Sequence, residues 1–322
     1  MPIKRYYLLP VAPGAARLYT SRMPKRLLVF CLFLLSSLSL AQTTRAEKLV
    51  EVLHDPTSSY VFVVAHRGGW EHDWENRAPE NSLANIDKAV KMDFDVFETD
   101  LAQTADGHIV VMHDLTVDRT TNGVGAVTEL TLAQLKALRL RYTNGELSDE
   151  TVPTFEEFLQ RAQKRILFKI DYRAPLGTFP EAVRLVEKYE MLDQVFFRFD
   201  AADEETVQTL AGFVEDGMPY TPTLLLFRMR TPQEVRSLLE AFDLAIIEVF
   251  FEENELTDEG RDAVRVAEDA GLLVETHEWG SRWWTGRDAW RKLLETGVRM
   301  VHTRNPEAFT RYLERRGLHA LP

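Results

Sequence analysis

From residue 61 to the end of the chain, short apolar runs alternate with longer amphipathic stretches. The short runs have the length of β-strands, and the longer stretches have the apolar spacing near 3.6 of α-helices. Nine predicted strands lie at residues 61–65, 94–101, 109–113, 166–171, 194–198, 220–226, 244–250, 272–276 and 300–303. Predicted helices lie at residues 82–92, 179–189, 203–214, 231–242, 258–270, 287–296 and 307–316. Several begin at Ser, Thr or Asp, whose side chains accept the N–H groups of a first turn.

The repeated strand–helix order predicts a parallel sheet, and eight such units predict a closed (β/α)₈ barrel, the TIM barrel. Nine strands are one more than this barrel needs. Asp106-Gly107 is a signal for a two-residue hairpin turn, which makes residues 109–113 an extra antiparallel strand. We therefore predict an α/β protein with one barrel domain at residues 59–322, after a short segment at residues 42–58. A doubly wound open sheet is the alternative.

The first 41 residues follow a different pattern. The apolar run at residues 27–41 comes directly after Lys25-Arg26 and ends in small residues, as a secretory signal peptide does. The run is shorter than the roughly 20 residues that a membrane-spanning helix needs. We expect a signal peptide over residues 1–41, with Met23 as a possible true start, and hence a secreted or periplasmic protein. An uncleaved membrane anchor is the alternative.

Composition and charge narrow the classes of partner. The chain has 322 residues, of which 45% are hydrophobic and 27% are charged, so it can bury a sizeable core. Its formal net charge is -12, which argues against a general surface for nucleic acid or for an anionic membrane; nothing in the sequence indicates a protein partner. A bound cation could still create a local positive site. The single cysteine, Cys31, lies inside the predicted signal peptide.

Polar groups follow the first predicted strand directly. His66-Arg67-Gly68 comes after the apolar run VFVVA, at the strand end where barrels of this type place their active sites. Arg67 offers a planar fork of donors that suits a phosphate. Gly68-Gly69 would let the backbone approach a ligand closely. We therefore expect an anionic ligand at this strand end.

The second predicted strand adds two carboxylates. Glu98 and Asp100 are two residues apart and share a strand face, where a hard divalent cation, Mg²⁺ or Ca²⁺, would relieve their repulsion. If Asp106 and Gly107 are the two turn residues, Asp100 lies opposite His113 and the two side chains point to the same face. Glu98, Asp100 and His113 would then gather beside His66.

At this point the chain resembles the glycerophosphodiester phosphodiesterase family. The matching segments are His66-Arg67-Gly68, Pro79-Glu80-Asn81-Ser82, Glu98-x-Asp100, Thr104-x-Asp106-Gly107, Val110-Val111, His113-Asp114, Asp118-Arg119-Thr120-Thr121 and, more loosely, Val152-Pro153-Thr154-Phe155-Glu156-Glu157 and Thr303-x-x-Pro306. The resemblance implies a TIM barrel and a divalent cation held by Glu98 and Asp100. It also implies His66 and His113 as the acid–base pair and Arg67 on the phosphate. Which histidine is the acid stays open, as does whether water or a substrate hydroxyl attacks.

The fourth strand departs from the family pattern, which has an acid followed two residues later by lysine. Here Lys169 precedes Asp171, so we take Asp171 as the third metal ligand and Lys169 as a phosphate contact. A purely structural Lys–Asp pair is the alternative, and Glu248 and Glu275 are rival carboxylates. Two further departures concern the last strands. The family's Trp-Thr is replaced by Glu275-Thr276, and its final Asp by Arg304.

These residues predict a secreted, metal-dependent phosphodiesterase that acts on small glycerophosphodiesters or lysophospholipids. The alternatives are a phospholipase that forms a cyclic phosphate and a barrel that binds phosphate esters without turnover. Trp-rich loops at residues 69–74 and 279–284 could cover the barrel mouth, cage a choline headgroup or touch a membrane surface transiently. A second metal site formed by His72, Asp73, His277 and Glu278 is a further possibility.

Overall fold

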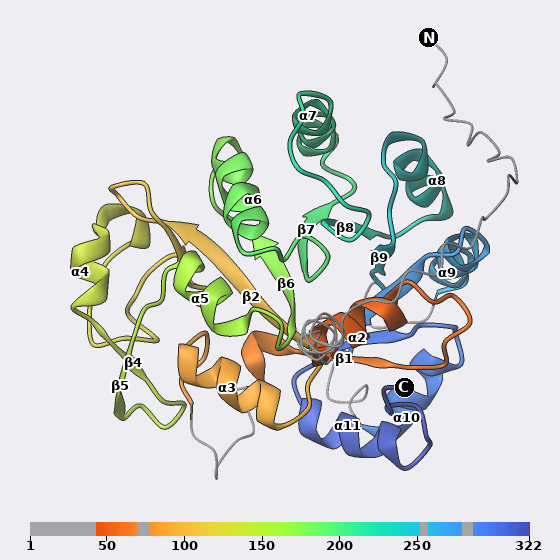
Figure 1. Cartoon of the computed structure of the whole chain (residues 1–322), viewed down its shortest axis with the longest axis horizontal. Coiled ribbons are helices and arrows are strands. Elements are labelled where there is room, and N and C mark those ends of the chain that lie inside the picture. The colour runs from red at the N-terminus through yellow and green to blue at the C-terminus, as the bar shows by residue number, and fades with distance from the viewer. Residues whose placement is uncertain (1–42, 70–77, 252–256, 279–285) are drawn as a thin grey trace, which may run out of the picture. The chain divides into compact units, whose positions relative to one another are not determined.

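The computed structural model describes residues 43–69, 78–251, 257–278 and 286–322 (Figure 1). In this part of the chain, eight parallel strands close into a ring, because β1 pairs with β11 on one side and with β2 on the other. The ring strands are β1 (Phe62–Ala65), β2 (Val96–Gln103), β6 (Leu167–Tyr172), β7 (Val195–Asp200), β8 (Leu225–Met229), β9 (Ile246–Val249), β10 (Leu273–His277) and β11 (Met300–Thr303). The predicted closed barrel is confirmed, and the open sheet is excluded.

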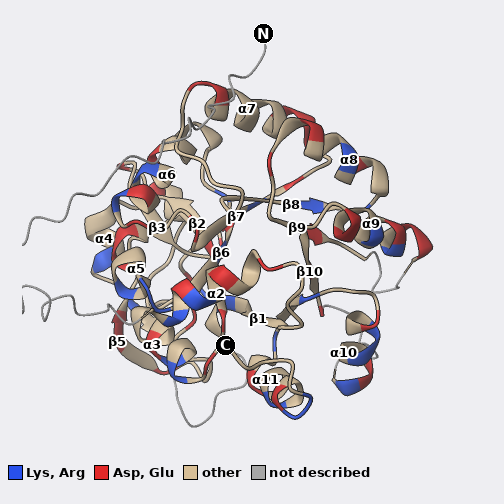
Figure 2. Cartoon of the chain, turned by 45° about the vertical axis from the view of Figure 1, so that its right-hand side comes forward, with Lys and Arg blue, Asp and Glu red and all other residues tan. Residues whose placement is uncertain are grey.

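A helix follows each ring strand and packs outside the ring. These helices are α3 (Leu83–Lys91), α5 (Phe155–Ala162), α6 (Phe179–Lys188), α7 (Glu204–Glu215), α8 (Pro232–Ala241), α9 (Asp258–Asp269), α10 (Arg287–Leu294) and α11 (Pro306–Glu314). Acidic and basic residues are interspersed along outer helices such as α8, α9 and α10 (Figure 2). The predicted helix bounds are correct to within two residues, but α5 was not predicted.

One predicted strand is misplaced. Residues 220–226 were expected to form a strand, whereas β8 begins at Leu225. The preceding residues form a turn in which Leu224 N donates to the carbonyl of Thr221, and Pro222 has no N–H to contribute to a ladder. The apolar run therefore starts in this turn and continues into the strand.

The connection between β2 and α5 is longer than the others. It contains β3 (Ile109–Val111), which pairs antiparallel with β2 outside the ring, as predicted for the extra strand. It also contains η2 (Val127–Glu129), α4 (Leu132–Lys136) and a separate antiparallel pair, β4 (Arg139–Arg141) with β5 (Leu147–Thr151). These short elements were not predicted.

The barrel interior has two layers of different chemistry. Side chains alternate along each strand, so every second residue points inward. Nearest the start of the strands, the inward residues are apolar and include Phe62, Val96, Leu167 and Phe196. One step further along, the inward residues are polar or charged in most strands; they are Glu98, Lys169, Arg198, Arg228, Glu248, Glu275 and His302. The second layer lies towards the strand ends, where a barrel carries its active site.

Helix α2 (Arg45–Leu53) closes the apolar end of the barrel. Thr44 and Glu47 form a reciprocal capping box that starts the helix. Its buried residues share one face and belong to the same apolar cluster as the inner strand residues; they are Ala46, Leu49, Val52 and Leu53. Helix α2, within the short segment predicted at residues 42–58, is therefore part of the barrel's core.

The predicted signal peptide, residues 1–41, lies outside the described residues. Among the residues that are described, no helix is both long enough and apolar enough to cross a membrane.

Candidate active site

Three carboxylates meet at the ends of two neighbouring ring strands. Glu98 and Asp100 lie two residues apart on the same face of β2. Asp171 of β6 pairs directly with Asp100. Oxygen atoms of the three residues lie within 4.8 Å of one another, and all three residues are buried. The structure thus brings together the three residues predicted as metal ligands.

The surroundings of these carboxylates fit a hard divalent cation. Both carboxylate oxygens of Asp100 are buried and accept no hydrogen bond from the described residues, although Arg173 Nη2 lies 2.8 Å from Oδ1. Burial, together with the charges of Glu98 and Asp171, raises the pKa of Asp100 well above its ordinary value. Burial also raises the pKa of Glu98. Because Mg²⁺ and Ca²⁺ prefer oxygen ligands that carry negative charge, Glu98 and Asp100 could hold such an ion.

Asp171 differs from the other two carboxylates because it has a cationic partner. Arg198 Nε donates to Asp171 Oδ1 over 2.7 Å, and Arg198 Nη2 donates to Oδ2. Burial alone would raise the pKa of Asp171, but this bidentate pair holds it below its ordinary value. Each carboxylate oxygen retains a second lone pair. Asp171 can therefore still bind an ion, and its role as third ligand stays a prediction.

His66 and Arg67 leave β1 in the 3₁₀ turn η1 (His66–Gly68). The Arg67 N–H donates to Glu98 Oε2 over 2.9 Å, which ties this turn to the carboxylate group. Gly68 has φ 74°, and a Cβ atom there would lie 2.2 Å from a ring carbon of Phe97. Positive φ and close packing against Phe97 therefore require glycine at this position. The predicted close approach of this backbone to a ligand stays a prediction.

The hairpin between β2 and β3 has a three-residue loop instead of the predicted two-residue turn. Thr104 N donates to the carbonyl of His108, and Gly107 N donates to the carbonyl of Thr104. Gly107 has φ 86°, as expected of a loop in which a left-handed glycine follows a turn. Residues 105–107 form the loop, so the strand register shifts by one residue from the prediction.

This shift changes the partner of Asp100. Leu101 pairs with Val111, and Met112 N donates to the Asp100 carbonyl over 3.0 Å. Met112 rather than His113 thus lies opposite Asp100, and the predicted pairing is wrong. His113 comes after the end of β3 and is positioned by contacts of its own.

A chain of ion pairs holds His113. Its Nδ1 lies 2.6 Å from Asp114 Oδ1. Arg119 binds the other oxygen of Asp114 through Nε at 2.6 Å, and its Nη1 donates to Glu80 Oε2 over 2.7 Å. Glu80 in turn accepts from Arg67 Nη1 over 3.2 Å. Arg119 and Glu80 thereby connect the His113-Asp114 segment to the His66-Arg67-Gly68 turn. Both residues lie in segments that match the family, but their roles were not predicted.

These contacts determine which ring nitrogen of His113 carries hydrogen. Hydrogen bonds from Arg119 lower the pKa of Asp114 to about 2, so this carboxylate is ionised near neutral pH and can only accept. Nδ1 of His113 is then the donor, and Nε2 keeps a lone pair. Burial lowers the pKa of His113, as do Arg67 and Arg173, although Asp114 acts in the opposite direction. A neutral imidazole with a free Nε2 lone pair is suited to accept a proton.

Arg173 connects the histidine segment to the carboxylates. Its Nη1 donates to the His113 carbonyl over 3.2 Å, and its Nη2 is the group beside Asp100. Arg173 also lines a cavity of about 230 Å³ next to Asp171, together with Arg198 and the aromatic rings of Tyr172 and Phe199. Arg173 and Arg198 were not among the predicted site residues. Their position at the C-terminal ends of predicted strands could have indicated them, because a barrel carries its active site there.

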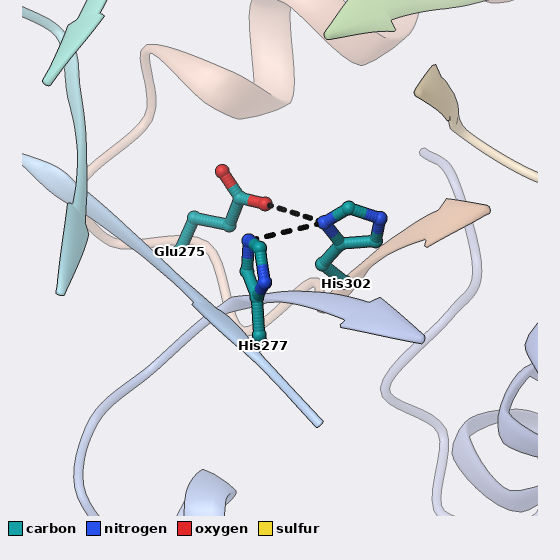
Figure 3. Close-up of side chains that lie close together, drawn as sticks. All are labelled: Glu275, His277 and His302. Carbon is teal, nitrogen blue, oxygen red and sulfur yellow. Dashed lines mark hydrogen bonds and ion pairs between the residues drawn. The ribbon is translucent and has the colours of Figure 1, made fainter. Parts of the chain in front are cut away.

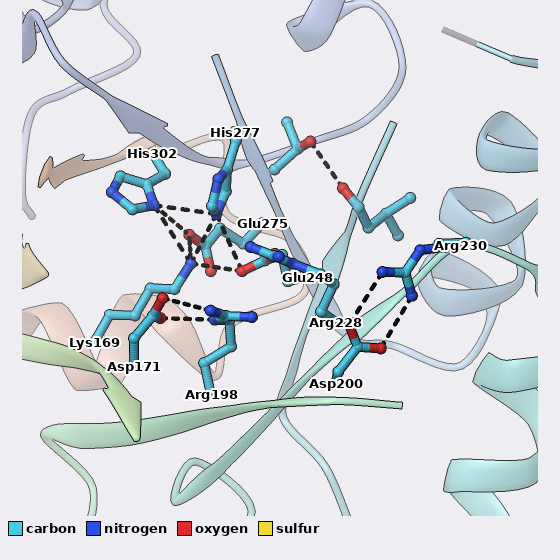
Figure 4. A network of polar contacts seen from close by, with 12 residues as sticks. Lys169, Asp171, Arg198, Asp200, Arg228, Arg230, Glu248, Glu275, His277 and His302 are labelled. Atoms are coloured by element: carbon cyan, nitrogen blue, oxygen red, sulfur yellow. Dashed lines mark hydrogen bonds and ion pairs between the residues drawn. The ribbon is translucent and has the colours of Figure 1, made fainter. Parts of the chain in front are cut away.

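A second polar group lies in the barrel interior. Side-chain atoms of Glu275, His277 and His302 lie within 4.8 Å of one another (Figure 3). Lys169 is fully buried, and its amine donates to Glu248 Oε2 over 2.6 Å and to Glu275 Oε1 over 2.5 Å (Figure 4). Burial raises the pKa of Glu275 to about 8. The predicted contact of Lys169 with phosphate stays a prediction, and these partners argue against it.

Comparisons with known proteins identify the family of this chain. Residues 66–308, well over half of the chain, match the glycerophosphoryl diester phosphodiesterase family. The chain belongs to this family. A curated glycerophosphodiester phosphodiesterase from Caldanaerobacter subterraneus subsp. tengcongensis is 32% identical over 190 residues, which are 57% of this chain and 74% of that protein. Members of the family are phosphoric diester hydrolases, so the predicted enzyme class is confirmed.

Solved structures of the family share the fold. A glycerophosphoryl diester phosphodiesterase from Parabacteroides distasonis aligns with a TM-score of 0.70 at 20% identity and covers 87% of this chain and 95% of its own. An Oleispira antarctica phosphodiesterase, solved with the product sn-glycerol-3-phosphate, aligns with a TM-score of 0.59 at 22% identity. It covers 79% of this chain and 96% of its own.

Some predicted groups cannot be placed in the family site. The Trp-rich loops lie outside the described residues, except for Gly69 in the first, and so do His72 and Asp73 of the possible second metal site. The other two members of that site are described but lie in different surroundings. His277 contacts Lys169 at 3.2 Å, whereas Glu278 accepts hydrogen bonds from Gly286 N and from Thr303.

Proposed function

We propose that this chain hydrolyses glycerophosphodiesters or lysophospholipids in a reaction that requires a divalent cation. The observation that carries the proposal is the buried group of Glu98, Asp100 and Asp171, next to a histidine held by an ionised aspartate. The carboxylates would hold the ion, Mg²⁺ or Ca²⁺, which when bound would neutralise negative charge on the phosphate. The remaining chemistry belongs to side chains of the chain itself.

His113 and His66 divide the proton transfers. His113 accepts the proton of the attacking hydroxyl at Nε2, because its Nδ1–H is committed to Asp114. His66, in the turn that follows β1 and that Arg67 N ties to Glu98, donates a proton to the leaving alkoxide.

Two arginines bind the phosphate in this proposal. Arg67 lies in the turn next to His66, and Arg173 lies between Asp100 and the cavity. Planar guanidinium groups match the oxygens of a phosphate ester. The aromatic rings of Tyr172 and Phe199 lie on the same cavity and would contact the alcohol part of the substrate.

The location of the enzyme is proposed from the pattern of its N-terminal residues. The predicted signal peptide at residues 1–41 supports a secreted or periplasmic enzyme. A lysophospholipid substrate would also bring the barrel mouth to a membrane surface, where the Trp-rich loops would make transient contact.

The test is hydrolysis of glycerophosphocholine and lysophosphatidylcholine by the purified protein, followed by phosphorus NMR. We expect a linear phosphate monoester as product, and loss of activity in EDTA that Mg²⁺ or Ca²⁺ restores. A cyclic phosphate would instead identify a phospholipase-type reaction, and binding without turnover would identify a silent barrel. Full activity in chelator, or in the His66→Ala/His113→Ala double variant, would refute the mechanism.

A further inference from the structure

The amine of Lys169 lies at the centre of four side chains from three other ring strands (Figure 4). Glu248 Oε2 and Glu275 Oε1 are its nearest partners, at 2.6 and 2.5 Å. His277 Nε2 lies 3.2 Å away and His302 Nδ1 lies 3.5 Å away. We call the four surrounding side chains the cation cage. These four residues are distinct from the group of Glu98, Asp100 and Asp171.

The cage needs a cation for a physical reason. Glu248 and Glu275 are both fully buried, and a buried carboxylate is destabilising unless a positive group compensates it. Arg228 Nε donates to the other oxygen of Glu248, and Lys169 is the cation that contacts both glutamates. The lysine amine carries one positive charge and three donors, which match the two glutamates and one imidazole nitrogen. Lys169 therefore occupies the position that a bound ion would take between the four side chains.

The spacing of the cage also matches that of a metal site. Four ligands about 2.1 Å from a tetrahedral Zn²⁺ lie roughly 3.4 Å from one another. In the cage, His277 Nε2 is 3.1 Å from His302 Nδ1 and 3.2 Å from Glu248 Oε2, and His302 Nδ1 is 3.8 Å from Glu275 Oε1. Two imidazoles and two carboxylates are a ligand set that suits Zn²⁺ and Co²⁺ better than Mg²⁺ or Ca²⁺.

We propose that the barrel interior contains a transition-metal site whose ion is replaced by the amine of Lys169. In the native chain the lysine keeps this site closed to exchangeable ions. Removing the amine opens a His₂Glu₂ site for Zn²⁺ or Co²⁺. The cage also connects to the outer carboxylates, since His302 Nε2 lies 3.5 Å from Glu98 Oε2.

The experiment is a Co²⁺ titration of the native protein and of Lys169→Ala, read by visible absorption and by metal analysis. We expect Lys169→Ala to bind about one further equivalent of Co²⁺ per chain, with the intense visible bands of a tetrahedral, nitrogen-ligated ion. Zn²⁺ at about 100 times its Kd should raise the Tm of this variant by roughly 5 °C or more. Adding His277→Ala should abolish both effects.

Lys169→Met is the matched control, because methionine fills a similar volume without a charge. It should be less stable than the native protein and gain no further ion. If Lys169→Ala does not fold alone, refolding in Zn²⁺ should recover it while refolding in Mg²⁺ should not. The proposal fails if Lys169→Ala binds no more Co²⁺ than the native protein under either condition. It also fails if native protein shows the nitrogen-ligated spectrum. Neither readout depends on hydrolysis, so this test is independent of the proposed function.

Discussion

At the scale of residues, the site depends on how acids are partnered rather than on how many are present. Asp100 is buried beside two other carboxylates with Arg173 next to one oxygen, Asp171 is held by a bidentate pair with Arg198, and Asp114 is held ionised by Arg119. The same functional group therefore serves two purposes. Crowded, buried carboxylates attract a divalent cation, and an acid paired bidentately with arginine keeps a fixed negative charge that can orient a neighbouring imidazole.

Asp114→Asn should impair catalysis more than folding. The amide cannot provide the fixed negative charge that keeps hydrogen on Nδ1 of His113, so Nε2 would lose its role as acceptor. We expect kcat to fall by about 10²–10⁴-fold, with a nearly unchanged Tm. Asp118→Asn is the control, since Asp118 is exposed and its carboxylate accepts a hydrogen bond from the loop N–H of Gly125. Equal losses in the two variants would contradict the assigned role of Asp114.

Gly68→Ala should destabilise the protein by about 2–4 kcal/mol, because it adds a clash with Phe97 to the strain of positive φ. Gly145→Ala provides the comparison. Gly145 has φ 86°, but no heavy atom lies within 4 Å of a Cβ placed there, so only backbone strain of about 1–2 kcal/mol is expected. Urea unfolding measures both values. If they were the same, the contact with Phe97 would carry no energetic weight.

At the scale of elements, the sequence was sufficient to predict the strands of the ring. It was not sufficient to predict the geometry of the hairpin between β2 and β3. Short apolar runs separated by helices of period 3.6 predicted all eight ring strands, because a strand that is buried on both faces is apolar throughout. The start of β8 was placed too early. The hairpin could not be predicted in the same way. Asp-Gly occurs both in two-residue turns and in three-residue loops in which glycine follows a turn. The loop length decides which residues of β2 and β3 lie opposite each other, and one extra residue shifts every pair by one.

The site was predictable to the extent that it is local. Glu98 and Asp100 share one strand face, so their proximity follows from the backbone alone. The partners of Lys169 could not be predicted in this way. They come from β9, β10 and β11, and only the order of strands around the closed ring brings them together. Arg173 and Arg198 were not predicted as site residues because an arginine at a strand end is usually exposed to solvent.

Helix α2 gives a prediction at this scale. Leu49→Ala should lower the free energy of unfolding by about 2–5 kcal/mol, since Leu49 is fully buried against the apolar end of the barrel. Glu51→Ala, on the exposed side of the same helix, should change it by less than about 0.5 kcal/mol. Denaturant unfolding of both variants would show whether α2 belongs to the cooperative unit. Similar small effects would mean that it does not.

At the scale of the whole molecule, the barrel joins an apolar half to a charged half. The ionisable groups of the charged half make stability depend on pH and on divalent ions together. Burial raises the pKa values of Glu98 and Asp100 above their ordinary values of 4.5 and 3.8. The folded state then holds more protons than the unfolded state above about pH 4, so the contribution of this pair to stability falls as pH rises.

A divalent cation should reverse this trend. It binds the ionised carboxylates, so Mg²⁺ or Ca²⁺ should raise the Tm more at pH 8 than at pH 5. Differential scanning calorimetry with and without the ion measures the effect. Asp100→Asn should remove most of the gain at pH 8. A gain that is equal at both pH values, or that survives in Asp100→Asn, would place the ion elsewhere.

The two-layer interior has a consequence for folding. Lys169 is 106 positions from Glu275 and 133 positions from His302, so the charged layer closes some of the longest loops in the chain. Contacts of such long range form late, because loop closure costs entropy that only the completed ring repays. Helices and strand pairs can be present before β11 returns to β1. A chain in that state has the secondary structure of the enzyme while Lys169 is still apart from Glu275 and His302. Burial of the Lys169 amine therefore marks the moment at which the ring is complete.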